Sequence, residues 1–125
     1  MAPTSLSSAA ASRPASEAVA KPVQLRRLAA GDIDAALGHY RDEVGPAVAA
    51  SFVGAVERAL AHLARHPHNG SLRFAFELGV PELRAWTIKR FPYVIFYVEL
   101  DPRIDVWRVL HARCDVPATL ADLSE

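Results

Sequence analysis

The sequence predicts a two-layer α+β domain in which a helical hairpin packs on one face of an antiparallel sheet. Three observations support this fold class. A short strand-like run comes first, two helical segments with apolar stripes follow it, and three β-prone runs come after them. Short turns separate the last three runs, so these strands are expected to pair as a meander. The expected order is β-α-α-β-β-β, with one further strand possible.

Length and composition favour one globular domain. The chain has 125 residues, 51% of them hydrophobic, which is enough to form a core without disulfide bonds. Cys114 is the only cysteine, so no intramolecular disulfide is possible. We find no apolar run near the roughly 18 residues of a membrane span and no secretory signal, and we expect a soluble, cytoplasmic protein without a membrane partner.

The charges balance, with 14 lysines and arginines against 14 acidic residues. A domain that holds nucleic acid by charge alone usually carries a basic excess. Attraction of the whole protein to nucleic acid is therefore not expected, although a local basic patch is compatible with a balanced total.

Residues 1–22 differ in composition from the rest of the chain. They are mostly Ala, Ser and Pro, and they contain few large aliphatic side chains. Such a segment buries too little apolar area to offset the entropy of ordering it. We predict a disordered tail over residues 1–22 and one folded domain over residues 23–125. A transit peptide or an upstream start codon would give the same composition.

The first ordered segments are a strand and a helix. Residues 23–28 alternate weakly, and Asp32 is a plausible N-cap for the helix that follows. Gly45 suits the end of this helix, and Pro46 suits the first turn of the next one. The first helix is marked by large side chains at spacings of three and four: Ile33, Leu37, Tyr40 and Val44.

The second helix has the clearest pattern in the chain and is expected to end at Pro67, before the turn at Asn69-Gly70. Because the link at Gly45 is so short, the two helices should form an antiparallel hairpin. The apolar stripe consists of Val48, Phe52, Val56, Leu60 and Leu63, and a second stripe of Ser51, Arg58, His62 and Arg65.

The second half of the domain has the pattern of strands. Residues 83–90 alternate, residues 93–98 are continuously apolar, and residues 104–112 alternate again. The segment between the helices and these strands is ambiguous, and residues 72–76 are a candidate extra strand. Residues 117–123 are a candidate short helix.

Three runs carry a resemblance to a known family: LRAW at 83–86, RFPYVIFY at 90–97 and RVLHARCD at 108–115. In this order and spacing they resemble the C-terminal half of RelE/ParE-family toxins, and the likeness extends over the whole domain. The resemblance implies the β-α-α-β-β-β layout predicted above. It also implies one of two activities, because RelE-like members cleave mRNA in the ribosome whereas ParE-like members act on DNA gyrase. Fold alone does not choose between them.

Cleavage of the RelE kind needs cations that stabilise charge on the phosphate and a group that transfers a proton. By resemblance, Lys89 matches a strand lysine of the nucleases and Arg113 matches the arginine after the last strand. The position of the central-strand arginine holds Val94, however, and no tyrosine follows Tyr97. The nuclease set is therefore incomplete, and the run around Tyr93 is similar to ParE-like toxins.

Other candidates have structural alternatives. His111 is a candidate general base, but no serine or cysteine motif accompanies it, so a structural histidine is the stronger interpretation. His62, His66 and His68 have no acidic partner at metal-binding spacing, and we expect no metal or other cofactor. The basic residues near the sheet have two interpretations: they form a basic patch, or they make ordinary ion pairs with acidic residues such as Glu82 and Asp115. These basic residues are Arg84, Lys89, Arg90, Arg108 and Arg113.

The resemblance thus predicts that the chain is the ParE-like toxin of a plasmid stabilisation (toxin–antitoxin) system. Such a toxin inhibits DNA gyrase by binding to it, so we expect a protein that is not an enzyme. Its expected partners are gyrase and a ribbon-helix-helix, ParD-like antitoxin that carries any DNA contact. The antitoxin is expected to lay an amphipathic segment across the hairpin and sheet. The candidate contact residues are Arg84, Trp86, Arg90 and Arg113. Two alternatives are an mRNA interferase that uses Lys89, Arg113 and His111, and an inactive interaction module.

Overall fold

The computed structural model describes residues 20–113, and its element order confirms the predicted succession of one strand, two long helices and a meander. A 3-10 turn and a short helix lie between the second long helix and the meander. The elements are β1 Val23–Leu25, α2 Arg27–Glu43, α3 Pro46–Arg65, η1 Pro67–Asn69, α4 Arg73–Leu78, β2 Arg84–Thr87, β3 Tyr93–Glu99 and β4 Ile104–His111.

The four strands form one sheet in the order β1-β4-β3-β2. β2, β3 and β4 pair antiparallel, as predicted for the meander, whereas β1 pairs with β4 in parallel. The sheet is thus mixed, where the sequence predicted an antiparallel one. The two antiparallel helices return the chain to the end where β1 starts, so β2 runs in the direction of β1. Two hairpins later, β4 does the same.

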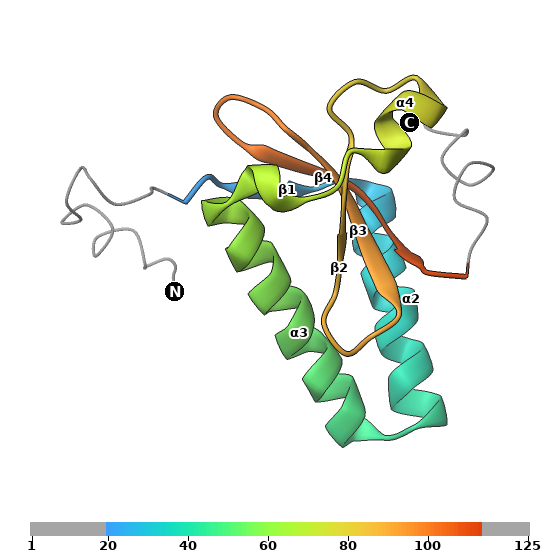
Figure 1. The fold of residues 1–125 in the computed structure, drawn as a ribbon. Coiled ribbons are helices and arrows are strands. Elements are labelled where there is room, and N and C mark those ends of the chain that lie inside the picture. The colour runs from blue at the N-terminus through green and yellow to red at the C-terminus, as the bar shows by residue number, and fades with distance from the viewer. Residues whose placement is uncertain (1–19, 114–125) are drawn as a thin grey trace, which may run out of the picture.

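The predicted helical hairpin is present, and Figure 1 shows α2 and α3 meeting at the short link between them. Gly45 in this link has φ +138° and ψ 163°, a conformation that is essentially restricted to glycine. Pro46 follows it at the first position of α3, as predicted. The hairpin therefore owes its sharp reversal to this Gly-Pro pair.

Successive side chains of β3 point to opposite faces of the sheet and belong to two apolar clusters. Ile95 and Tyr97 pack in the main core with α2 and α3. Val94, Phe96 and Val98 pack in a second cluster with side chains of α4. Both faces of this strand are thus covered, which explains why its sequence is continuously apolar rather than alternating.

The start of α2 differs from the prediction. The helix begins at Arg27, directly after β1, so Asp32 is an internal residue of the helix and not its N-cap. Its carboxylate instead accepts hydrogen bonds from Arg108 and from the backbone N–H of Val109, 2.9 Å away on β4. The presence of an aspartate at position 32 is therefore explained by its partners on β4, and not by the helix cap that the local pattern predicted.

The segment before β2 also differs, because residues 72–76 do not form a strand. They lie mostly in α4, which ends at Gly79 with φ +66°. Phe74 and Leu78 lie four residues apart on one side of this helix and pack against the second cluster. Helical spacing toward the sheet therefore outweighs the β-propensity of the two phenylalanines.

Among the described residues, α3 is the one helix with the length and apolar composition of a membrane span, although we expected none. One side of it, including Phe52, Val56 and Leu63, is buried in the main core. Packing against α2 and the sheet accounts for its apolar character.

The folded region begins before the predicted boundary at residue 23. The backbone N–H of Lys21 donates to the carbonyl of Ala64 at 3.0 Å, and Ile104 N–H donates to the carbonyl of Pro22 at 2.9 Å. The rest of the predicted tail, residues 1–19, and the candidate helix at 117–123 lie outside the described residues.

Candidate functional site

A groove of about 480 Å³ lies between α3 and β2, the edge strand at one side of the sheet. Its floor contains an aromatic pair, because the ring of His62 stacks on Trp86 with centroids 4.9 Å apart and an angle of 20° between the planes. The residues that line the groove are Ala55, Arg58, Ala59 and His62 of α3, then Trp86, Thr87, Lys89 and Arg90.

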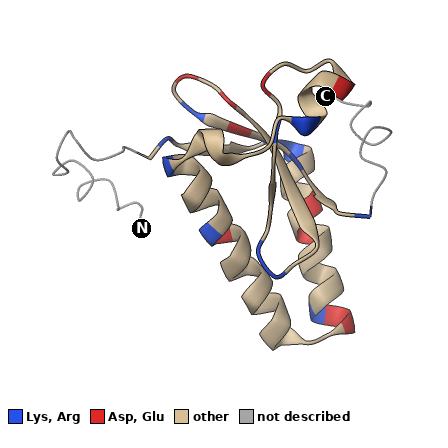
Figure 2. Cartoon of the chain, in the orientation of Figure 1, with Lys and Arg blue, Asp and Glu red and all other residues tan. Residues whose placement is uncertain are grey.

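Three cations surround this aromatic floor. Arg58 comes from α3, while Lys89 and Arg90 come from the turn between β2 and β3, which is blue in Figure 2. None of the three side chains makes a hydrogen bond or ion pair with another described residue. The groove therefore presents uncompensated positive charge beside a flat aromatic surface, a combination suited to an anionic partner with an apolar or planar part.

The turn that carries these cations is held in an unusual conformation. Arg90 has φ +75°, in the left-handed region that costs a non-glycine residue about 1–2 kcal/mol. Phe91 N–H donates to the carbonyl of Ile88 at 3.4 Å and closes the turn around it. Strained residues of this kind cluster at functional sites, so an arginine at this position favours a role for its side chain.

Arg84 lies away from this groove. Its guanidinium donates to the backbone carbonyls of His68 and Gly70 at 3.0 and 2.9 Å, and so holds the η1 turn against β2. The sequence predicts partner contacts at Arg84, Trp86, Arg90 and Arg113. The structure brings Trp86 and Arg90 together in the groove and gives Arg84 a structural role.

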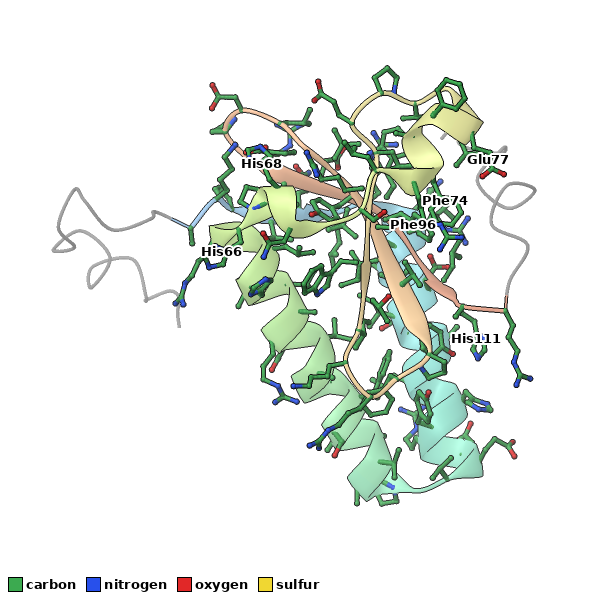
Figure 3. The ribbon with its side chains drawn as sticks, viewed as in Figure 1. His66, His68, Phe74, Glu77, Phe96 and His111 are labelled. Carbon is green, nitrogen blue, oxygen red and sulfur yellow. The ribbon has the colours of Figure 1, made fainter. Side chains whose placement is uncertain are left out.

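His111 and Arg113 lie at the end of β4, where Figure 3 labels the histidine. The His111 ring packs edge-on against Tyr93 at 5.2 Å, and its Nδ1 accepts the backbone N–H of Arg113 at 3.0 Å. The neutral ring then carries its proton on Nε2, so neither nitrogen is available as a base in this arrangement. The Arg113 side chain is exposed and has no ion pair with a described residue.

Tyr93 is the phenol closest to this histidine. Burial raises the pKa of its hydroxyl, and the neighbouring Tyr40 raises that pKa further. The phenol therefore stays protonated at neutral pH and does not act as a general base there.

The residues matched to the nuclease set do not converge. Lys89 lines the groove on the α3 side of the sheet. Val94 packs in the second cluster on the opposite face and pairs with Leu110 of β4. An apolar pair near the end of β3 and β4 thus occupies the position that the nuclease resemblance assigns to a cation. Among residues 20–113, the groove brings three cations beside His62, but neither Val94 nor Arg113 lines it.

The histidines do not form a metal site within the described residues. His62 stacks on Trp86 and contacts the Asn69 amide at 3.0 Å, while His68 pairs with Glu99 at 2.6 Å. The His66 ring lies 4.9 Å from that of His62, without an acidic ligand. Cys114 lies outside the described residues.

Sequence reasoning placed Arg58 and His62 on a polar stripe of α3 but did not name them as contact residues. Their spacing of four residues puts them on one side of the helix. This spacing could have identified them as a pair. The strand that they face depends on the packing of α3 against the edge of the sheet, which no local pattern encodes.

Comparison with known proteins assigns the family. The family model described as "ParE toxin of type II toxin-antitoxin system, parDE" matches residues 23–116. A solved structure described as "Chromosomal ParDE TA system from P. aeruginosa" superposes with a TM-score of 0.62 at 24% identity, over 73% of this chain and 95% of that chain. No curated protein sequence matches. Because the family model spans every described strand and helix, the chain belongs to the ParE family of type II toxin–antitoxin toxins.

Proposed function

We propose that this toxin acts in the cytoplasm by binding DNA gyrase, without making or breaking a bond itself, and that a cognate antitoxin holds it inactive. The observation that carries this proposal is the groove, where Arg58, Lys89 and Arg90 have no partner among the described residues. Unpaired cations around an aromatic floor are suited to macromolecular recognition, since tight interfaces concentrate their energy in arginine and aromatic side chains.

The antitoxin is the partner that we place in this groove. An amphipathic segment with acidic side chains would lie along α3 and the end of β2 beyond the Ser71–Ala85 bridge, with an apolar side chain against the His62–Trp86 pair. Its carboxylates would neutralise the three cations. In this proposal the antitoxin is ParD-like, contains a ribbon-helix-helix domain and supplies any contact with DNA.

The arrangement of the sheet favours binding over RNA cleavage. Phosphoryl-transfer catalysis of the RelE kind depends on several cations fixed around one phosphate. Here Val94 and Leu110 pack in the second cluster on one face of the sheet, while Lys89, in the β2–β3 turn, lines the groove beside α3. His111 accepts a backbone hydrogen bond instead of facing a nucleophile.

The test measures both activities with the same preparation of the full chain. Gyrase supercoiling of relaxed plasmid is assayed with increasing toxin, and translating ribosomes are assayed for mRNA cleavage at the decoding site. We expect inhibition of supercoiling and intact mRNA. Codon-positioned cleavage with normal supercoiling would instead identify an mRNA interferase. A chain that affects neither reaction and does not slow growth when expressed alone would be an inactive interaction module.

The antitoxin contact has its own test by charge reversal. The double variant Arg58→Glu, Lys89→Glu should weaken antitoxin binding about 100-fold, because two desolvated charge contacts become repulsive. Arg41→Glu is the matched control, since Arg41 is an exposed arginine of α2 at 61% side-chain exposure and lies outside the groove. Equal affinity of the double variant and the control, measured by calorimetry, would move the antitoxin away from the groove.

A further inference from the structure

The short helix α4 covers part of the sheet face opposite α2 and α3. Its inner side chains Phe74, Ala75 and Leu78 pack against the second cluster. In Figure 3, Phe74 lies beside Phe96 of β3, and the two rings meet edge-on at 5.4 Å. The helix is therefore fixed to the domain by its inner side.

The outer side of α4 is apolar where a surface helix is usually polar. Phe76 is 94% exposed and Leu72 is 45% exposed, and they are two of the three exposed large hydrophobic residues in the described part of the chain. Next to them lies a shallow hollow of about 570 Å³, lined by Leu72, Ala75, Phe76, Gly79 and Pro81. An exposed phenylalanine thus stands at the rim of an apolar hollow.

A charged pair lies beside this apolar stripe. Arg73 and Glu77 are four residues apart and share one side of the helix, and Glu77 points outward in Figure 3. They make no ion pair with each other or with another described residue. Arginine before glutamate is also the less favourable order within a helix. The Arg73 guanidinium lies over the Phe74 ring, 4.7 Å from its centroid, so both charges lack a counter-charge among the described residues.

We propose that α4 is the contact between two copies of this chain, related by a twofold axis. In an antiparallel pair of helices, residue 73 of one copy lies beside residue 77 of the other. One axis then forms two Arg73–Glu77 ion pairs, because the stripe is complementary to itself. The same axis places Phe76 of each copy against the apolar hollow of its partner. An acidic or a basic partner would match only one of the two charges.

The size of this surface determines the affinity that we expect for the dimer. A six-residue helix with its flanking loop lies at the lower end of interface sizes, so we expect a dimer with a dissociation constant of about 1–100 µM. The contact leaves the groove on the α3 side uncovered in both copies. A dimer of this kind would present two basic grooves at once and bind a two-site partner with added avidity.

The test is sedimentation analysis of the full chain over a wide concentration range. The wild-type chain should form dimers. Phe76→Ser should raise the dissociation constant at least about tenfold, because it removes a central aromatic from both halves of the contact. Val44→Ser is the matched control, since Val44 is exposed at 57% but lies at the far end of α2. The control should dimerise like the wild type.

A charge swap tests the geometry without touching the apolar stripe. Arg73→Glu alone should weaken the dimer about three- to tenfold through repulsion between four carboxylates, and the double variant Arg73→Glu, Glu77→Arg should restore it. A monomer at about 500 µM would overturn the proposal, as would a dimer that Phe76→Ser does not weaken. Monomeric protein whose antitoxin affinity falls with Phe76→Ser would also overturn it and would assign α4 to the antitoxin.

Discussion

The two ends of the sheet differ in how their charges are used. At the end where β4 begins, three cations have partners: Lys21 bonds to Glu99, Arg26 bonds to Asp105, and Arg84 bonds to backbone carbonyls, whereas the buried Nε of Arg103 has no hydrogen-bond partner among the described residues. At the end where β2 turns into β3, Lys89 and Arg90 have no partner among the described residues. Both ends belong to the same sheet and a chain of zero net charge.

This difference separates structural charges from recognition charges. A paired charge holds two segments that are distant in the sequence, such as residue 21 and residue 99. An unpaired charge stabilises nothing within the domain, and its value depends on a partner. Substitutions at the paired end should therefore change the free energy of unfolding, and substitutions at the groove should change binding.

The largest loss of stability is expected at Asp32, the bridge between α2 and β4. Its carboxylate accepts two bonds from Arg108 at 2.8 Å and one from Val109 N–H, and both side chains of the ion pair are 15% exposed. Asp32→Ala removes two charge-assisted hydrogen bonds from Arg108 and leaves the Val109 N–H without this acceptor, so it should cost about 3 kcal/mol of unfolding free energy. Urea denaturation measures this value.

Asp32→Asn is the control for this substitution. The amide oxygen can still accept the Val109 N–H while the negative charge is lost, so the expected cost is smaller than that of alanine. A loss below about 1 kcal/mol for Asp32→Ala would mean that the bridge contributes as little as a surface ion pair.

A smaller loss is expected at Tyr97, which is fully buried. Its hydroxyl donates to the carbonyl of Pro67 at 2.7 Å and accepts the N–H of Gly70 at 3.0 Å. Tyr97→Phe leaves this donor and acceptor unpaired and should cost about 1–2 kcal/mol. Tyr40→Phe, at a partly exposed tyrosine of α2, is the control and should change thermal stability less. Equal effects of the two changes would contradict the role of the Tyr97 hydroxyl.

The paired end should also respond to pH through Glu99. The Lys21 ammonium, bonded to this carboxylate at 2.6 Å, holds the pKa of Glu99 below its ordinary value of 4.5, and His68 lowers that pKa further. A lowered pKa in the folded state stabilises the fold above pH 4.5, and this contribution is lost as pH falls through the lower folded value.

Glu99→Gln should therefore cost about 0.5–1 kcal/mol at pH 7 and less at pH 3, measured as the difference from the wild type in urea. The Glu57→Gln variant is the control, because Glu57 is exposed and has no ion pair with a described residue. A Glu99→Gln difference that is constant between pH 7 and pH 3 would show that the ion pair does not contribute to folding.

The local sequence pattern was sufficient to predict most helices and strands, but it was insufficient to predict which distant residues they contact. The stripe of α3, the Gly45-Pro46 reversal and the continuous apolar run of β3 each depend on nearby residues, and all three predictions were confirmed. Asp32 was misinterpreted as a cap because its partner, Arg108, is 76 residues away. Residues 72–76 were given a possible strand because the sheet face that α4 covers is formed only by tertiary packing.

The same limit applies to the candidate site. The sequence predicted five basic residues near the sheet but did not distinguish those with structural partners from those available for binding. Arg84 and Arg108 proved to have structural partners, whereas Lys89, Arg90 and Arg113 have none among the described residues. Arg58 was absent from that list because it comes from α3. Only the packing of this helix against β2 brings it to the groove.

The smallest change in stability is expected at Arg90. A substitution there also gives the most direct test of the difference between the two ends of the sheet. Its φ of +75° is costly for arginine and ordinary for glycine, so Arg90→Gly relieves strain while it increases the entropy of the unfolded chain. We expect a net effect between zero and about 1 kcal/mol of added stability in urea denaturation. The same variant should bind the antitoxin about tenfold more weakly, because one of the three cations around the groove is lost.

Higher stability together with weaker antitoxin binding in Arg90→Gly would identify Arg90 as a residue that serves binding. A residue that lowers stability and raises affinity is retained for its partner, which is the relation expected at a functional site. Arg41→Gly is the control: this position lies in the last turns of α2, so glycine should cost about 1 kcal/mol there and leave antitoxin affinity unchanged. Loss of stability in Arg90→Gly with unchanged affinity would place Arg90 among the structural charges, and the two ends of the sheet would then not differ as described.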